Sequence, residues 1–150
     1  MRRLIRLGGL TACALGLVAP PSTSARATHT TTLSEVGHLH LLSRHNFTLT
    51  EQGSAAGTIA GTLYVRMVAV SSSRVTAEVQ IGTRRGTIAA SGSGSYRRTD
   101  GTASFSGSLS IDSGSGDYAD VHGSGLHFSG TIDEAHHDAI TVRVSGTVSD

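Results

Sequence analysis

One five-residue pattern recurs four times in this chain: a large apolar residue, Ser or Ala, Gly, Ser or Thr, and a second apolar residue. The copies are Ile59–Leu63, Phe105–Leu109, Phe128–Ile132 and Val144–Val148. In each copy the apolar residues and the central glycine alternate with small polar residues, which is the period of a β-strand with one buried face. Glycine inside a strand marks a bend, so its repetition predicts a sheet curled into a small closed barrel.

Strand-like runs follow one another to the C-terminus, and no stretch has the apolar spacing of a helix. The predicted strands cover residues 36–51, 56–70, 73–82, 85–97, 102–112, 122–132 and 139–148. The first run is either two strands or one bent strand. Because the connections are short, they allow only hairpins. The predicted fold is therefore all-β, a single antiparallel and mostly up-and-down β-barrel of about eight strands formed by residues 36–150.

The alternation also assigns the two faces of the predicted sheet. The inward face is apolar and glycine-rich, with no charge along its central stretches, whereas short Ser and Thr side chains face outward. A transmembrane barrel has the opposite arrangement, so no membrane span is predicted. The inward glycines fit either closely packed walls or an open pocket. The candidate ligand-binding residues of the lumen, the space enclosed by the strands, are His45, Phe47, Leu63, Met67, Tyr96, Phe105 and Phe128.

The N-terminus has the features of an export signal. Residues 1–27 combine a basic start, an apolar stretch from Leu7 to Val18 and an A-x-A cleavage site at Ala25–Ala27. Residues 28–35 are predicted to be a disordered leader. An alternative is a membrane-tethered lipoprotein, because Leu10–Cys13 resembles a bacterial lipobox. The predicted location is otherwise secreted and extracellular.

The charges of the mature part argue against nucleic-acid binding. After removal of residues 1–27 the chain has eight arginines against eleven acidic residues and no cysteine, so it offers neither a basic surface nor a disulfide or thiol. All twelve basic residues are arginine, as expected from GC-rich coding. These features indicate a secreted bacterial protein.

Eight histidines raise the question of a metal site. His38 and His40 share one face of the first strand, and His136 and His137 lie in a loop with several carboxylates. Imidazole and carboxylate together suit Zn, Cu or Ni. The spacing matches no known metal motif, however, and a solvated loop explains the same residues, so no cofactor is predicted.

A glycine-rich segment, residues 113–125, separates two of the repeated strands. It resembles the turn of the allene oxide cyclase and dirigent-protein barrels, with Gly114, Gly116, Tyr118 and Gly123 at the matching positions. The resemblance covers residues 102–132. It implies an eight-stranded antiparallel barrel, in which this turn is structural and the ring of Tyr118 caps one end. Catalytic members of that superfamily carry acidic residues inside the barrel, so the uncharged inward face predicted here transfers no catalytic residue.

Three functions remain in competition. The first is a secreted, non-enzymatic barrel that binds a small apolar ligand in its lumen or serves as a structural extracellular module. The second, which the resemblance implies, is an isomerase or cyclase acting on a lipid-like or phenolic substrate. The third is a metal-binding module. Tyr64 and Arg66 alternate with Val68 and Val70 on the outward face, and this mixed patch is a candidate contact between copies of the chain.

Overall fold

The structure is a computed structural model that describes residues 29–136 and 139–150. The predicted signal segment and Cys13 lie outside the described residues. Eight strands form the described part of the molecule, which confirms the predicted fold class. They are β1 (Thr30–His45), β2 (Thr48–Gly57), β3 (Gly61–Ala69), β4 (Arg74–Thr83), β5 (Gly86–Thr99), β6 (Thr102–Gly114), β7 (Leu126–Asp133) and β8 (Ala139–Ser149).

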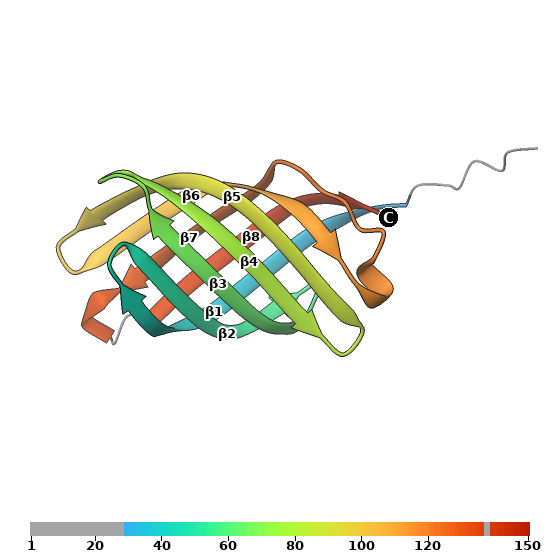
Figure 1. Cartoon of the computed structure of the whole chain (residues 1–150), viewed down its shortest axis with the longest axis horizontal. Coiled ribbons are helices and arrows are strands. Elements are labelled where there is room, and N and C mark those ends of the chain that lie inside the picture. The colour runs from blue at the N-terminus through green and yellow to red at the C-terminus, as the bar shows by residue number, and fades with distance from the viewer. Residues whose placement is uncertain (1–28, 137–138) are drawn as a thin grey trace, which may run out of the picture.

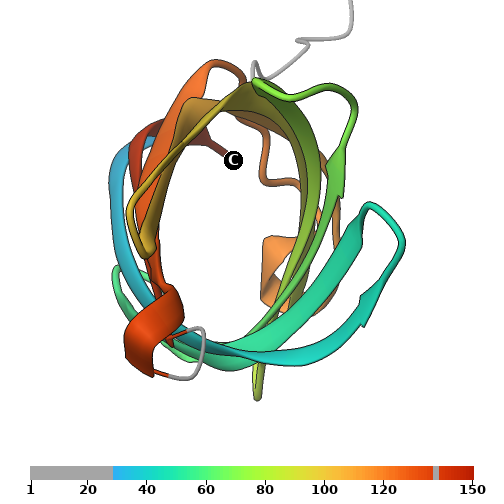
Figure 2. The same ribbon diagram turned by 90° about the vertical axis from the view of Figure 1, so that its left-hand side faces the viewer.

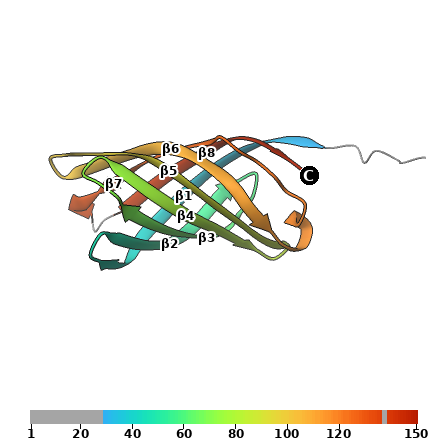
Figure 3. The ribbon, with the colours of Figure 1, turned by 45° about the horizontal axis from the view of Figure 1, so that its top comes forward.

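The strands form one closed barrel in which each strand pairs with its neighbours in the sequence. Every pairing is antiparallel, and β1 pairs with β8 to close the ring. Figure 1 shows the barrel from the side, and Figure 2 shows the ring of strands from one end. The strands cross the barrel axis obliquely in Figures 1 and 3, as closure of a sheet requires.

The first strand begins earlier than its alternation predicts. β1 starts at Thr30, and its pairing with β8 runs from Thr30↔Ser149 to Leu39↔Ile140. The prediction of a disordered leader is therefore wrong from Thr30 onward. Thr-rich sequence lacks an apolar signal, but here backbone pairing with β8 and the burial of Leu33 hold the segment in the sheet.

The first predicted strand is in fact two strands joined by a tight turn. The turn falls at Asn46 and Phe47, where Asn46 adopts a left-handed conformation with φ of 52°. Asparagine tolerates this conformation better than most residues, which makes it suited to the turn. A bulge between Leu41 and Ser43 precedes it. Residues 52–55, expected as a loop, belong to β2, and the real connection to β3 is residues 58–60.

The connections divide between the two ends of the barrel. One end, on the left in Figure 1, carries the β1–β2, β3–β4 and β5–β6 turns together with a short helix, η2 (Glu134–His136). The opposite end carries the β2–β3 and β4–β5 turns, the helix η1 (Gly116–Tyr118) and the C-terminus. Neither helix in the described part of the chain is long or apolar enough to cross a membrane.

The hydrophobic core is the lumen itself. The predicted inward residues of β3 to β8 are buried or half-buried there, and the alternating Ser, Thr, Arg and Glu side chains face outward. The buried apolar side chains of this core include Leu63, Met67, Phe105, Leu109, Leu126 and Phe128.

Candidate functional site

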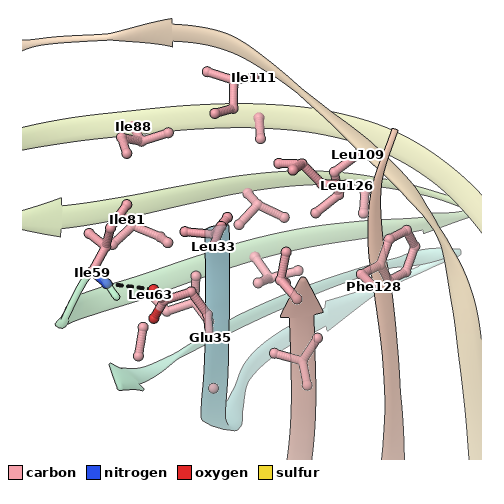
Figure 4. A pocket seen from close by; sticks show the side chains of 18 of the residues that line it. Leu33, Glu35, Ile59, Leu63, Ile81, Ile88, Leu109, Ile111, Leu126 and Phe128 are labelled. Carbon is pink, nitrogen blue, oxygen red and sulfur yellow. Dashed lines mark hydrogen bonds between the residues drawn. The ribbon is translucent and has the colours of Figure 1, made fainter. Parts of the chain in front are cut away.

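Within the described residues, the lumen contains an apolar cavity of about 70 Å³. Its walls are almost entirely apolar and come from all eight strands and the β2–β3 turn. Figure 4 shows several of the side chains that surround it, including Leu33, Leu63, Ile88 and Leu126. Protein interiors leave few voids larger than a water molecule, so this space is a distinctive feature of the barrel.

The inward glycines make room for packed side chains. Phe105 of β6 lies opposite Gly130 of β7, and Gly107 of β6 lies opposite Phe128 of β7. A Cβ atom on Gly130 would lie 2.3 Å from Cζ of Phe105, and one on Gly107 would lie 2.8 Å from Cε1 of Phe128. Each phenylalanine ring thus covers the glycine of the neighbouring strand. Of the two roles left open for these glycines, close packing predominates, and the cavity is the space left over.

Glu35 is a buried acid in the cavity wall. It lies on β1 with only 4% of its surface exposed. Its Oε1 accepts a hydrogen bond of 2.5 Å from the backbone N–H of Ile59 in the β2–β3 turn, drawn as a dashed line in Figure 4. Its Oε2 is also buried and has no hydrogen-bond partner among the residues that the structure describes. One carboxyl oxygen therefore fixes the turn, and the other remains unsatisfied.

The environment of Glu35 disfavours its ionised form. Burial raises the pKa of the carboxyl above its usual value of 4.5, and the backbone N–H groups of Ile59 and Thr58 offset part of that rise. A folded-state pKa above the unfolded value means that the folded chain holds this proton more tightly. The stability that Glu35 contributes is therefore fully present below about pH 4.5 and is lost as the pH rises through the folded-state pKa.

The change Glu35→Gln tests this linkage. We expect the wild type to lose stability relative to the variant as the pH rises from 4.5, by about 1.4 kcal/mol for each unit that separates the two pKa values. Glutamine is nearly isosteric and cannot ionise, so the difference isolates the carboxyl. Urea unfolding at a series of pH values measures it. A difference that stays constant across the series would contradict the assignment.

Glu51 is a second acid on the inward face, and it is fully buried. The prediction of an uncharged inward face was therefore wrong at two positions. Both acids fit the period of their strands: Glu35 alternates with Leu33 and Gly37, and Glu51 alternates with Leu49 and Gly53. Glu35 was missed because the first strand was predicted to start at Val36. Glu51 was missed because residues 52–55 were predicted to be a loop, so the alternation beyond Glu51 was not recognised.

The two acids lie in different parts of the lumen. Glu35 pairs in register with Gly57, which is six positions from Glu51 along β2. At ~3.3 Å per residue, these positions are roughly 20 Å apart. A pair of carboxyls that flanks one reacting bond needs a separation of about 5–9.5 Å. Glu35 and Glu51 therefore do not form such a pair.

The predicted ligand-binding residues divide into three groups. Leu63, Met67, Phe105 and Phe128 line the cavity, whereas Tyr96 packs against the core without lining it. His45 and Phe47 are exposed and do not face the lumen, which corrects the prediction for both. The bulge in β1 and the turn at Asn46 and Phe47 break the alternation that placed these two residues on the inward face.

The histidines proposed as metal ligands do not form a centre in the described part of the chain. His38 and His40 are exposed on the outer face of β1, and His137 lies outside the described residues. Nδ1 of His136 is 2.7 Å from Oδ2 of Asp133. That hydrogen bond is the main reason why the pKa of Asp133 is lowered. No group of three or more His, Cys, Asp or Glu side chains converges among the residues that the structure describes.

The glycine-rich segment folds back over one end of the barrel. Gly116 has a left-handed φ of 62° and begins η1. Arg85 of the β4–β5 turn binds Asp117 through Nε and Oδ2 at 2.7 Å. Tyr118 is partly buried against the core, while Gly114 approaches its backbone and Gly123 lies beside Val148. η1 is visible at the far end of the barrel in Figure 2.

The mixed patch proposed as a contact between copies lies on the outer wall. Tyr64 is 43% exposed, and Val70, the residue after β3, is 60% exposed. Arg66 forms an ion pair of 3.2 Å with Glu78 of β4. The patch therefore combines exposed apolar surface with a cation that already has a partner.

Comparison with known proteins identified no relative of this chain. No protein-family model matches it, and no curated protein or solved structure does so either.

Proposed function

We propose that this protein is an exported β-barrel that binds a small apolar molecule inside its lumen. The observation that carries the proposal is the apolar cavity inside the closed barrel, with Glu35 among the residues that line it. Binding sites for small molecules are concave and mostly apolar, with a few polar groups that fix the orientation of the ligand. The cavity combines these properties in a chain whose core is otherwise tightly packed.

The size of the cavity limits its occupant. An engineered cavity of about 150 Å³ in another protein takes up benzene or xenon. The cavity here has about half that volume, so it admits a xenon atom or a molecule of a few non-hydrogen atoms without rearrangement. A longer ligand would have to displace some of the side chains that fill the rest of the lumen.

Native mass spectrometry tests the proposal on protein purified without denaturation from the medium or envelope of its host. We expect a reproducible non-covalent adduct whose mass identifies the ligand. Xenon NMR supplies an independent test, because xenon needs only an apolar space. The variant Ala77→Val narrows the cavity and should weaken uptake, whereas Ala89→Val, on the outer face, should not. Bare protein that takes up no xenon would favour the structural module instead.

A second candidate is an isomerase or cyclase within a group similar to the allene oxide cyclase and dirigent-protein barrels. It is supported by the eight antiparallel strands, by the glycine-rich turn from Ser113 to Gly125, and by Glu35 as an acid inside the barrel. Burial raises the pKa of Glu35, which favours the protonated form that a general acid needs. A lipid-like or phenolic substrate exceeds the present cavity, which is why ligand binding is ranked first. Release of an added compound as an isomer of equal mass would favour the enzyme.

A further inference from the structure

The outer wall of the barrel has a hollow that is separate from the lumen. It has a volume of about 770 Å³ and lies over strands β5 to β8, which are neighbours in the wall (Figure 1). Serine and threonine side chains and the two arginines Arg97 and Arg143 supply most of its polar lining. The surface of the hollow is therefore rich in hydroxyl groups and cationic.

Strand register arranges these side chains in rows that run across the strands. The first row consists of three serines with an arginine at each end: Arg74, Ser95, Ser106, Ser129 and Arg143, on β4 to β8 in that order. Each is exposed or half-buried on the outer wall. At ~4.8 Å between neighbouring strands, the row extends roughly 19 Å along the wall.

A second row repeats this order two residues further along the strands. It consists of three hydroxyl side chains with a basic residue at each end: Arg97, Ser104, Thr131, Thr141 and His38, on β5 to β8 and then β1. The hydroxyl side chains of both rows line the hollow. Basic residues therefore stand on both sides of a field of hydroxyl groups.

The two arginines of the hollow lack a counter-charge. Neither Arg97 nor Arg143 forms an ion pair with a described residue, and no acidic residue in the described part of the chain lines the hollow. Asp133, two residues beyond Thr131, is bound by His136 instead. The hollow is thus a local cationic surface on a chain whose mature part has eleven acidic residues against eight arginines.

This combination selects a ligand that is both anionic and rich in hydroxyl groups. Guanidinium groups bind carboxylates through two parallel hydrogen bonds, and Ser and Thr hydroxyls both donate to and accept from sugar hydroxyls. A neutral sugar would leave the arginines without a counter-charge. Single-stranded nucleic acid needs aromatic rings on which its bases stack, but Tyr96 and Phe105 of the lining pack into the core.

We propose that the hollow over β5 to β8 binds a segment of a polysaccharide that carries carboxylate groups. The carboxylates bind Arg97 and Arg143, and the sugar hydroxyls between them bind the rows of Ser and Thr. This site lies on the opposite side of the barrel wall from the lumen, so it does not depend on the lumenal ligand.

A matched pair of sugars tests the inference. Hexagalacturonate and its full methyl ester have the same backbone and the same hydroxyls, but only the first carries carboxylates. Each is titrated into the purified protein while NMR follows the backbone amides of β5 to β8. The acid form should bind about tenfold more tightly than the ester. It should lose that advantage as the salt concentration rises, because salt screens exposed charges.

Paired variants separate the hollow from the overall charge. Replacing both Arg97 and Arg143 with glutamine should weaken the binding of hexagalacturonate about tenfold. The control replaces Arg66 and Arg85 with glutamine, which removes the same charge from arginines that are already bound to carboxylates. That control should leave the affinity unchanged. All four arginines are exposed, so each variant should fold.

The hydroxyl rows are tested by Ser104→Ala combined with Ser129→Ala, which should weaken the binding of both sugars. Equal affinities for the acid and the ester, no binding of either, or equal effects of the two arginine double variants would overturn the proposal. Tighter binding of polyphosphate or of a single-stranded oligonucleotide would also overturn it, and would assign the hollow to a phosphate polymer. Xenon uptake reports on the lumen separately in every case.

Discussion

Replacing Phe128 with alanine should lower the free energy of unfolding by about 3–5 kcal/mol. The ring is 3% exposed, lines the cavity and lies 6.1 Å from the ring of Phe105, centroid to centroid. Its loss would remove buried apolar surface and leave a void beside the existing cavity. The void should persist because Gly94 and Gly107 lie beneath the ring, and neither has a side chain that could move to fill it.

The matched control is Phe47→Ala. Phe47 is 76% exposed at the β1–β2 turn, so the same substitution there should change stability by less than about 0.5 kcal/mol. Urea unfolding of both variants measures the contrast. Benzene should raise the stability of Phe128→Ala more than that of the wild type, since it binds the enlarged cavity only in the folded state. Similar losses in the two variants would show that the lumen is not the core.

Period-2 alternation was sufficient to predict the barrel and the inward faces of β3 to β8. It succeeded because those strands run through the barrel wall with one apolar side, and their registers keep that side inward. The alternation failed at β1 for a physical reason. A one-residue bulge after Leu41 reverses the face of every later side chain, and the turn at Asn46 follows immediately. His45 and Phe47 were assigned to the wrong face as a result.

Only part of the candidate site could be predicted from the sequence. Its apolar walls followed from the alternation, but its acid did not. Strand pairing with β8, a contact across the whole length of the chain, is what makes Thr30–Glu35 a strand and turns Glu35 inward. The N–H of Ile59, which fixes the carboxyl, comes from a turn whose position depends on where β2 ends. Neither contact leaves a local pattern in the residues around Glu35.

The meaning of the repeated pattern also required the structure. The sequence placed phenylalanine and glycine on one face of two strands, which predicted curvature and left closely packed walls and an open pocket as alternatives. The register between β6 and β7 supports close packing, because it sets each phenylalanine opposite the glycine of the other strand. A shift by two residues would preserve the faces, but in one direction it would set Phe105 opposite Phe128, and in the other it would set Gly107 opposite Gly130. The repeat therefore carries information about register that alternation alone does not contain.

Gly130→Ala tests this reciprocal packing directly. An added Cβ would lie 2.3 Å from Cζ of Phe105 and 2.5 Å from the carbonyl oxygen of Thr141 in β8, so the ring and the β7–β8 pairing must both shift. We expect a loss of about 1–3 kcal/mol in the free energy of unfolding, in the range of an overpacked core. Gly82→Ala is the control, because its nearest neighbour, the carbonyl oxygen of Thr62, is 4.0 Å away. That change should be neutral or slightly stabilising.

A double-mutant cycle separates the ring from the backbone. In Phe105→Leu, the shorter side chain leaves space over Gly130, so adding Gly130→Ala should cost less there than in the wild type, with a coupling of at least about 0.5 kcal/mol. The remaining loss in the free energy of unfolding would then come from the close approach of the added Cβ to the backbone of Thr141. Strictly additive losses would mean that the added methyl group strains the β7–β8 pairing alone. In that case the reciprocal arrangement of Phe105 and Gly130 would follow from the strand register without contributing to the packing of the lumen.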